Sequence, residues 1–466
     1  MVDLCLSFIC AVLATLLCAA WMTSRPQSAD VAKPFRGEGG SFGMEEVHVR
    51  KADLEQWKQK YLEAIQANDA PEVHRILRTG RLDVDTVLEV EDPGMVLASY
   101  KQGYWLPDYK LEKSWAMGLH LCVVYNALDA AMVLLENGAA TNKMPNGKTP
   151  LHVACQTANS DFVTLLLASW SKINILSLSG HTPLHHCATK ESIDCARLLL
   201  CKGADVNKAD NTSDQNTPLH RAAQCGLPQL VTLYLQHGAS VDALNSAQET
   251  PLMKAAFSSL DAKAQVYSPE HQLVCRILLD WGADPNVQDE THKTALHRAA
   301  WNLDQVVMQM LLEAGSDTRA MDADACAPLQ YLLKVTDREL VPEPELCFML
   351  LLNYNAARIY PPQFHMVLYH CHRFPKVIET LVNSYPLLLP TKRWRPAVPD
   401  DSYQRHRAFY DSMFAVCSKR PRSLQHLARC AIRASLGGFC QNSVPQLPLP
   451  SAMKRYVLLY PEGILC

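Results

Sequence analysis

The sequence predicts an all-α solenoid of about seven or eight repeated helix pairs, followed by a small helical module. Two short motifs recur together at a period near 33 residues. Apolar residues between them fall at helical spacing, as in Val163, Leu166 and Leu167. The first motif is Thr-Pro-Leu-His or a close variant, and its copies begin at Thr149, Thr182, Thr217, Thr250 and Thr294, with weaker copies at Met117 and Ala327. The second is Gly-Ala or Gly-Ser, beginning at Gly138, Gly203, Gly238, Gly282 and Gly315.

The residues of the first motif suit the start of a helix. Its Thr hydroxyl can cap the first turn, because the hydroxyl accepts a hydrogen bond from an unpaired backbone N–H. The following Pro loses nothing there, since its missing N–H would be unpaired in any residue. The Gly of the second motif permits the positive φ that ends the second helix. One such helix pair cannot bury its own apolar face, so several pairs must stack.

The period defines repeats over residues 54–357, with about seven regular copies after residue 116 and a degenerate copy at 54–85. Two insertions interrupt the period, at 86–114 and at 258–269. Insertions into a solenoid lie in loops, often on the binding face. The first insertion carries the aromatic residues Tyr100, Tyr104, Trp105 and Tyr109. We expect them either to pack as a cap on the first repeats or to contact a partner.

Residues 1–24 form an apolar leader, in which no charged residue occurs between Leu4 and Ser24. This stretch is close to the about 20 residues with which a helix crosses a bilayer. The leader is therefore either a membrane anchor or an apolar extension of a cytoplasmic protein. Asp3 and the lack of an early Lys or Arg count against a cleaved signal peptide. Residues 25–53 are expected to be a linker, and we expect a cytoplasmic protein, with a nuclear or membrane-anchored one as alternatives.

The repeat period stops after residue 357, and residues 358–416 are expected to be a helical connector with a Pro-rich, basic linker at 386–399. Residues 417–462 then hold two short motifs. The first is a helix capped by Ser423, with apolar residues at helical spacing: Leu424, Leu427, Ala428 and Ile432. Such a helix suits an apolar groove. The second is the extended segment Leu447, Pro448, Leu449 and Pro450, whose prolines present the leucines at low entropic cost.

Repeats of this kind, followed by these two motifs about 23 residues apart, resemble the ankyrin repeat and suppressor-of-cytokine-signalling (SOCS) box family. The resemblance covers residue 54 to the end of the chain. The segments 83–87, 95–107 and 357–365 are most similar to those of one particular member of the family. It implies that the motif His ties neighbouring repeats together. It also implies that Leu424, Leu427, Ala428 and Ile432 bind Elongin C, and that Leu447, Pro448, Leu449 and Pro450 select the type-5 cullin. Ala428 stands where the family usually has Cys or another small residue, which should weaken the packing slightly.

The resemblance implies a substrate-recognition subunit of a cullin-RING ubiquitin ligase, an adaptor that performs no catalysis itself. The expected partners are Elongin B, Elongin C, and the type-5 cullin with its RING partner. Unidentified substrate proteins would be held by the repeats, ubiquitinated and degraded by the proteasome. The alternative is an ankyrin scaffold or a membrane-tethered adaptor that works outside any ligase.

The composition points to neither nucleic acid nor a cofactor, and no catalytic motif is present. The net charge is −3, and after residue 390 there are 12 Lys and Arg against 4 Asp and Glu. This basic tail either suits protein docking or is simply a solvated face. The 17 cysteines include no CxxC pair, so we expect reduced, mostly buried thiols. No metal site is expected, because the group His365, His370, Cys371 and His372 lacks a second ligand pair at zinc spacing.

Two asparagines, Asn207 and Asn286, lie just after a Gly-Ala motif. The family resemblance places them where an oxygen-sensing asparaginyl hydroxylase modifies many ankyrin proteins. The alternative is that each asparagine only stabilises its hairpin through side-chain hydrogen bonds. Pro285 counts against modification of Asn286, because it stiffens the segment that an enzyme must extend.

Overall fold

The computed structural model describes residues 43–92, 96–97, 113–261, 266–336, 343–418 and 422–463, with side chains from residue 53 onward. The expected leader at 1–24 and most of the expected linker lie outside these ranges. The chain divides into two compact units, Met1–Gln56 and Trp57–Cys466. Of the first unit, the structure describes only the beginning of helix α2 (Gly43–Gln66). The second unit contains the rest of α2, from Trp57, and every other element discussed below.

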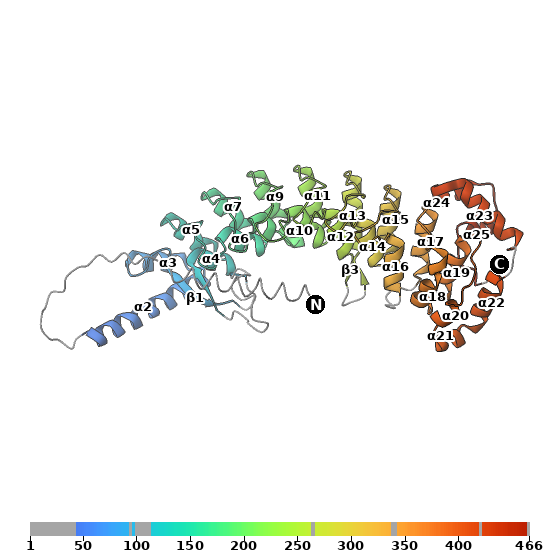
Figure 1. Ribbon diagram of the computed structural model, residues 1–466. Helices are drawn as coiled ribbons and strands as arrows, with labels where there is room; N and C mark the ends of the chain where they lie inside the picture. Colours follow the sequence, from blue (N-terminus) through green and yellow to red (C-terminus); the bar gives the residue numbers. More distant parts are fainter. Residues whose placement is uncertain are drawn as a thin grey trace, which may run out of the picture. The chain divides into compact units, whose positions relative to one another are not determined.

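Nine helix pairs follow one another in the described part of the second unit (Figure 1). They are α2 with α3 (Ala70–Arg78), α4 (Gly118–Val124) with α5 (Leu128–Glu136), α6 (Pro150–Gln156) with α7 (Ser160–Ala168), α8 (Pro183–His186) with α9 (Ile193–Cys201), α10 (Pro218–Gln224) with α11 (Pro228–Gln236), α12 (Pro251–Ser258) with α13 (Pro269–Asp280), α14 (Ala295–Trp301) with α15 (Gln305–Glu313), α16 (Pro328–Thr336) with α17 (Glu345–Asn353), and α18 (Phe364–Cys371) with α19 (Pro375–Ser384).

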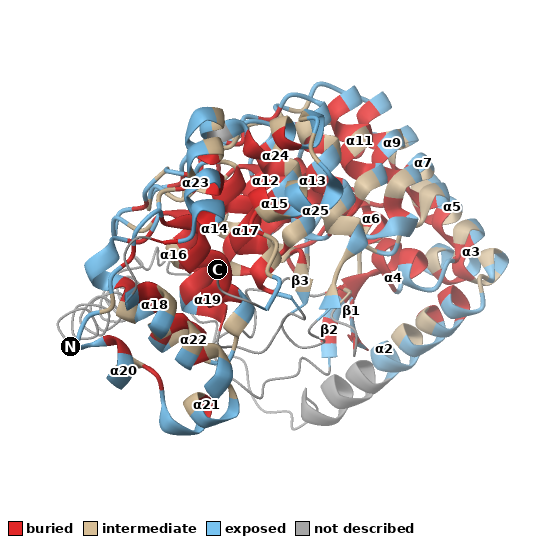
Figure 2. Ribbon diagram, turned by 90° about the vertical axis from the view of Figure 1, so that its right-hand side faces the viewer, coloured by how far each residue is buried: buried red, intermediate tan, exposed pale blue. Residues whose placement is uncertain are grey.

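Neighbouring pairs pack in register. First helices contact first helices, as in α10 with α12 and α12 with α14, and second helices contact second helices, as in α11 with α13. One cluster of buried apolar side chains joins all nine pairs. Figure 2 colours the buried residues red along the stacked helices. The expected all-α solenoid is confirmed, and its stability comes from the apolar faces that each pair buries against the next.

Hydrogen bonds from the motif histidines cross from one repeat to the next wherever the histidine is present, which excludes the repeat with Met253. The Nδ1 atom of His152 accepts a hydrogen bond from the backbone N–H of Thr149 over 3.1 Å. Its Nε2 lies 3.1 Å from the carbonyl oxygen of His181 in the next repeat, so Nε2 carries the proton and donates. The same bridge joins His185 to Asn216, His220 to Glu249 and His297 to Cys326. The ring is thereby fixed in its neutral form, with both nitrogens occupied.

Trp170 replaces the usual glycine in the turn after α7. Six repeats place a glycine with positive φ there, whereas Trp170 has φ of 64° and is 91% exposed. In the turn after α17, Asn355 takes the same conformation with φ of 66°. Asparagine tolerates a positive φ better than a bulky residue does, because a bulky side chain makes this backbone conformation strained.

We expect Trp170→Gly to stabilise the protein by about 1 kcal/mol, because glycine adopts positive φ without the strain of a Cβ. The exposed indole loses little packing on removal. Trp281 provides the matched control, since it ends α13 with φ of −87° and is 47% exposed. There, the change to Gly should cost stability. Thermal denaturation of both variants checks the prediction, and a lower melting temperature for Trp170→Gly would contradict it.

Both insertions form short antiparallel strand pairs, a small addition to the expected all-α fold. In the first, β1 (Val87–Glu91) pairs with β2 (Lys113–Met117), with Glu89 opposite Trp115. The aromatic residues expected to form a cap, at positions 100, 104, 105 and 109, lie outside the described residues. In the second, β3 (Leu260–Asp261) pairs with β4 (Val266–Tyr267). The hydroxyl of Tyr267 donates to the carbonyl oxygens of Asn302 and Leu303, which holds this insertion against the next repeat.

The helix-pair pattern continues beyond residue 357, where we expected it to stop. Helix α18 packs on α16, and α19 packs on α17, in the same register as the preceding pairs. Neither sequence motif marks this ninth pair, because Phe364 begins its first helix and Asn355 replaces the glycine before it. Pro375 at the start of α19 is the remaining signal, since α11 and α13 also begin with proline.

The stretch 386–399, which we expect to be a linker, is anchored to the core at Leu388, Trp394 and Val398, while most of its other residues are exposed. It contains the short helix α20 (Trp394–Ala397), followed by α21 (Asp400–Arg405) and α22 (Arg407–Ser418). Trp394 is fully buried, with its ring centre 5.1 Å from that of Phe364 and 6.3 Å from that of Phe414. The proline and arginine content of the segment predicts a linker. One large aromatic side chain, Trp394, is nevertheless enough to hold this otherwise polar stretch against the core.

Candidate functional site

The C-terminal module, residues 422–463, is built around helix α23 (Leu424–Leu436). Ser423 caps this helix by accepting a hydrogen bond from the backbone N–H of His426 over 3.2 Å, as expected. The helix ends at Gly437, whose φ of 57° suits glycine. The turn η4 (Gly437–Phe439), the short helices α24 (Cys440–Ser443) and η5 (Val444–Gln446), and α25 (Ser451–Val457) complete the module.

Helix α23 presents its apolar side chains to solvent and buries its basic ones. Leu424 is 85% exposed and Leu427 37%, and Ala428 is exposed beside them. Arg429 and Arg433 are buried. This arrangement reverses the usual one, in which a helix turns its apolar side toward the core. The sequence predicts the two faces correctly but does not show which of them faces outward.

The buried Arg433 holds α23 against the end of α17. Its Nη1 donates to the side-chain oxygen of Asn353 over 2.5 Å and to the carbonyl oxygen of Val457 over 2.8 Å. Its Nη2 donates to the carbonyl oxygen of Leu352 over 2.9 Å. Carbonyl groups at the end of a helix carry partial negative charge and lack partners within that helix. The guanidinium of Arg433 therefore supplies hydrogen-bond donors to the end of α17, and it holds the C-terminal module against the last repeats.

His426 forms a second anchor, one turn before Arg429. Its Nε2 donates to the carbonyl oxygen of Tyr385 over 2.8 Å, and its Nδ1 accepts from Arg429 over 2.8 Å. The guanidinium of Arg429 also lies 4.1 Å above the ring of Tyr456 in α25. Burial, with the nearby Arg422 guanidinium, lowers the pKa of His426 to about 4, so this histidine is neutral at physiological pH.

The fourth residue expected to bind Elongin C, Ile432, lies apart from the exposed face. It is half-buried and packs on a small apolar cluster of Cys440, Val444, Val457 and Leu458 inside the module. The structure thus brings three of the four residues together at the surface: Leu424, Leu427 and Ala428. Ile432 stabilises the module from within.

The expected cullin-binding segment is extended and partly exposed. Leu447 and Pro450 have ψ of 145° and 150°, the extended backbone that the prolines predict. Pro448 and Pro450 are exposed, and Leu449 is half-buried. Leu447 packs against the same apolar cluster as Ile432, which ties the segment to the module.

The two asparagines bridge neighbouring repeats through their side chains. Asn286 donates to the carbonyl oxygen of Gly315 over 3.1 Å and accepts from the backbone N–H of Asp317 over 2.7 Å. Asn207 makes the equivalent bonds to Gly238 and Ser240. The hairpin-stabilising hydrogen bonds are therefore present, and hydroxylation of Asn207 and Asn286 stays a prediction.

No group of three or more His, Cys, Asp or Glu in the described ranges could hold a metal ion. The cysteines that the structure describes are free, and most are buried. None of the helices within those ranges is long and apolar enough to span a bilayer.

The residues that sequence reasoning missed are the polar anchors of α23: Asn353, His426, Arg429 and Arg433. The basic residues 422, 426, 429 and 433 recur at helical spacing, which does place them on one face. Charged faces are usually solvated, so this spacing alone did not indicate burial. Asn353 has no local sequence signal, because its partners lie 80 or more residues away along the chain.

Comparisons with known proteins agree with this architecture. A family model described as "Ankyrin repeats (3 copies)" matches residues 119–210 and 207–289, and one described as "SOCS box" matches residues 420–458. Ankyrin repeat and SOCS box protein 16 of Homo sapiens is 36% identical over 405 residues, 85% of this chain and 87% of that protein. Protein 18 of the same name and organism is 37% identical over 365 residues, 78% of this chain and 76% of that protein.

Ankyrin repeat and SOCS box protein 10 of Homo sapiens is 33% identical over 416 residues, 87% of this chain and 88% of that protein. The runs 83–87, 95–107 and 357–365 had suggested the fourth member of the family, and these relatives give that narrower assignment no support. Matches of this identity over most of both proteins show that the chain belongs to the ankyrin repeat and SOCS box family.

Proposed function

We propose that this chain is the substrate-recognition subunit of a ubiquitin ligase built on Elongin B, Elongin C and the type-5 cullin with its RING partner. The repeats hold a substrate protein, and the C-terminal module holds the ligase. The chain contributes proximity, because it raises the effective concentration of substrate lysines near the charged ubiquitin-conjugating enzyme. Ubiquitination by this complex would direct the substrate to the proteasome.

The outward apolar face of α23 carries this proposal. A leucine that is 85% exposed at the first position of a capped helix buries almost nothing within the chain. An apolar groove on a partner would bury it together with Leu427 and Ala428. Elongin C supplies the groove in this proposal. The neighbouring Pro448 and Leu449 lie on the extended segment that would contact the cullin.

Most of the described cysteines are buried, which does not suit a nucleophile. A cysteine nucleophile works as the thiolate, so a reactive site lowers its pKa. Burial here does the opposite, since it raises the pKa of Cys195 to about 12 and that of Cys417 to about 11. Free thiols also suit the reducing cytoplasm, where we place this protein.

We expect Leu424→Asp to weaken capture of Elongin B/C at least about thirtyfold, the loss of an interface hot spot worth about 2 kcal/mol. The charge would face an apolar groove, whereas folding should be unaffected because Leu424 lies in solvent. Leu244→Asp is the matched control, since Leu244 is 53% exposed but lies in the repeats. Binding of purified full-length variants to immobilised Elongin B/C gives the affinities, and circular dichroism confirms folding.

The same assay separates the two binding surfaces. A double change, Pro448→Ser with Leu449→Ser, should retain Elongin B/C and lose the type-5 cullin, because it leaves α23 unchanged. Failure of the folded wild-type chain to capture either partner would refute the ligase proposal. It would favour the alternative, a scaffold or membrane-tethered adaptor that works outside any ligase.

Hydroxylation of Asn207 and Asn286 is proposed from their position in the hairpins, where both side chains are exposed. Co-expression with the oxygen-sensing asparaginyl hydroxylase should add about 16 Da per modified residue, the mass of one oxygen. Intact-mass spectrometry measures this, with the double variant Asn207→Ala, Asn286→Ala as the control. An unchanged mass for the wild-type chain would end the proposal.

A further inference from the structure

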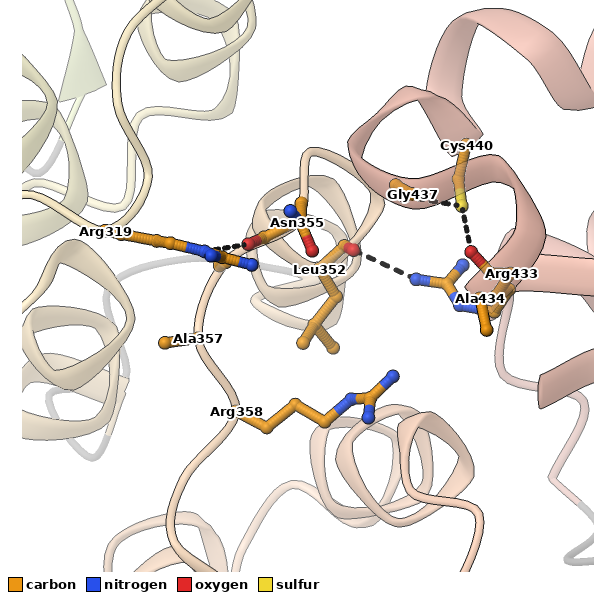
Figure 3. A pocket seen from close by; sticks show the side chains of 10 residues that line it. Arg319, Leu352, Asn355, Ala357, Arg358, Arg433, Ala434, Gly437 and Cys440 are labelled. Carbon is orange, nitrogen blue, oxygen red and sulfur yellow. Dashed lines mark hydrogen bonds between the residues drawn. The ribbon is translucent and has the colours of Figure 1, made fainter. Parts of the chain in front are cut away.

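A basic cavity lies where the last repeats meet the C-terminal module. Its volume is about 310 Å³, and its lining includes Arg319, Leu352, Arg358, Arg433 and Cys440. Figure 3 shows the three arginine side chains arranged around Leu352. They come from three separate parts of the chain, namely the loop after α15, the segment after α17, and α23. The cavity is distinct from the exposed face of α23, because Arg433 belongs to the opposite, buried face.

Within the described part of the chain, no carboxylate pairs with these three guanidinium groups. The described residues that line the cavity include neither Asp nor Glu. Among the described residues, no ion pair involves Arg319, Arg358 or Arg433. Arg319 donates to the carbonyl oxygen of Asn355 over 3.1 Å, and Arg358 lies 5.9 Å from the ring centre of Tyr385. Each of these contacts leaves most of the guanidinium donors available for a ligand.

Arg433 is the buried member of the group. It is 7% exposed, and its Nε has no hydrogen-bond partner among the described residues. Burial, together with repulsion from Arg358 and Arg429, lowers the pKa of Arg433 to about 10, although Cys440 acts in the opposite direction. The guanidinium stays protonated at physiological pH, so a positive charge is held inside the protein without a negative partner. Such a charge is costly unless an anion pairs with it.

We propose that this cavity binds a phosphate group carried by a small molecule. Arginine is the side chain best suited to this task, because its planar donors match the phosphate oxygens in pairs. Arg319 and Arg358 are exposed, so a ligand can reach both side chains. The buried Arg433 contributes a third positive charge. A phosphate here would contact the repeats and α23 together. It would therefore stabilise their junction, and the stabilisation would grow with the logarithm of the ligand concentration once that concentration exceeds the Kd.

Two sources could carry this phosphate, a soluble phosphoester or the headgroup of a phosphoinositide. Pyrophosphate and inositol hexakisphosphate are the soluble probes. Phosphatidylcholine vesicles with and without phosphatidylinositol bisphosphate test the headgroup. Binding to either kind of probe supports the site and identifies its source. Sodium chloride at equal ionic strength provides the reference for non-specific screening.

The test compares full-length wild type with Arg358→Gln, Arg319→Gln and Arg276→Gln. Arg276 is the matched control, an exposed arginine on α13 far along the chain from the cavity. We expect saturable binding to wild type, a loss of about tenfold or more in affinity for Arg358→Gln and Arg319→Gln, and no change for Arg276→Gln. Isothermal titration calorimetry measures the affinities, with circular dichroism as the folding check.

Two results would overturn the site. One is a wild-type response no larger than that to sodium chloride. The other is an equal loss of affinity in Arg276→Gln, which would show that binding follows overall charge. The Elongin capture of Arg358→Gln should equal that of wild type, so this experiment does not depend on the ligase proposal.

Discussion

Acidification from pH 6 to pH 5 is expected to lower the free energy of unfolding by about 3.5 kcal/mol through three of the buried histidines. Burial lowers the pKa of His120, His152 and His185 to about 4 in the folded chain. In the unfolded chain each histidine has its ordinary pKa near 6.5. Between these two values, only the unfolded state binds the proton, so acid favours unfolding.

Stability falls with falling pH because the pKa of each ring is lower in the folded chain than in the unfolded chain. Above pH 6.5, all three rings are neutral in both states and their contribution to stability is fully present. As the pH falls toward 4, each ring costs up to about 1.4 kcal/mol per pH unit. The geometry agrees with this direction, because Nε2 of each ring already faces a carbonyl oxygen as the donor.

Urea denaturation at pH 7.5, 6 and 5 measures the effect on the full-length chain. His120→Gln should reduce the slope of stability with pH by up to about 1.4 kcal/mol per unit in this window. His237→Gln, at an exposed position in the turn after α11, is the control and should leave the slope unchanged. Equal stability of the wild type at pH 7.5 and pH 5 would contradict the prediction.

Asn353→Leu is expected to cost about 3 kcal/mol or more at the junction between the repeats and the C-terminal module. Asn353 is fully buried at the end of α17. Its amide donates to Gln441 and to the carbonyl oxygen of Leu458, and its oxygen accepts from Arg433. Leucine has a similar size but leaves these groups, one of them charged, without a partner.

Asn383→Leu is the matched control for this change. Asn383 is also buried, on α19, but its side-chain oxygen has no hydrogen-bond partner among the described residues. The same substitution there should be nearly neutral. Hydrogen exchange read by mass spectrometry should show faster exchange in α23 for Asn353→Leu, with α10 to α13 unchanged. Equal exchange in the two variants would show that Asn353 does not anchor the module.

The repeated part of the fold could be predicted because its signals are local. Thr149, Pro150 and His152 each act within one turn of helix or on the next hairpin, so their recurrence predicts both the helices and the stacking. The ninth pair was missed because Phe364 replaces the motif while the packing continues. Trp394 was missed for a related reason, since its apolar partners lie in α18 and α22.

The sequence predicts which residues form the amphipathic helix of the candidate site, but it does not predict which face of that helix is exposed. The spacing of Leu424 and Leu427 shows an amphipathic helix, and either face could be the buried one. What decides the orientation is the supply of acceptors at the ends of α17 and α19, which hold Arg433 and His426. These acceptors are main-chain carbonyl groups, which every residue carries, so no side-chain pattern records them.

The histidine bridges run in one direction along the chain. Each ring reaches a carbonyl oxygen 28 to 31 residues further toward the C-terminus, from His120 through His297. During synthesis, the first helix of a repeat therefore waits for its last hydrogen bond until the next hairpin has left the ribosome. Truncation has unequal consequences at the two ends. A cut that removes leading repeats leaves every remaining ring with its acceptor, whereas a cut just after a repeat that carries a bridging histidine leaves that buried ring without one.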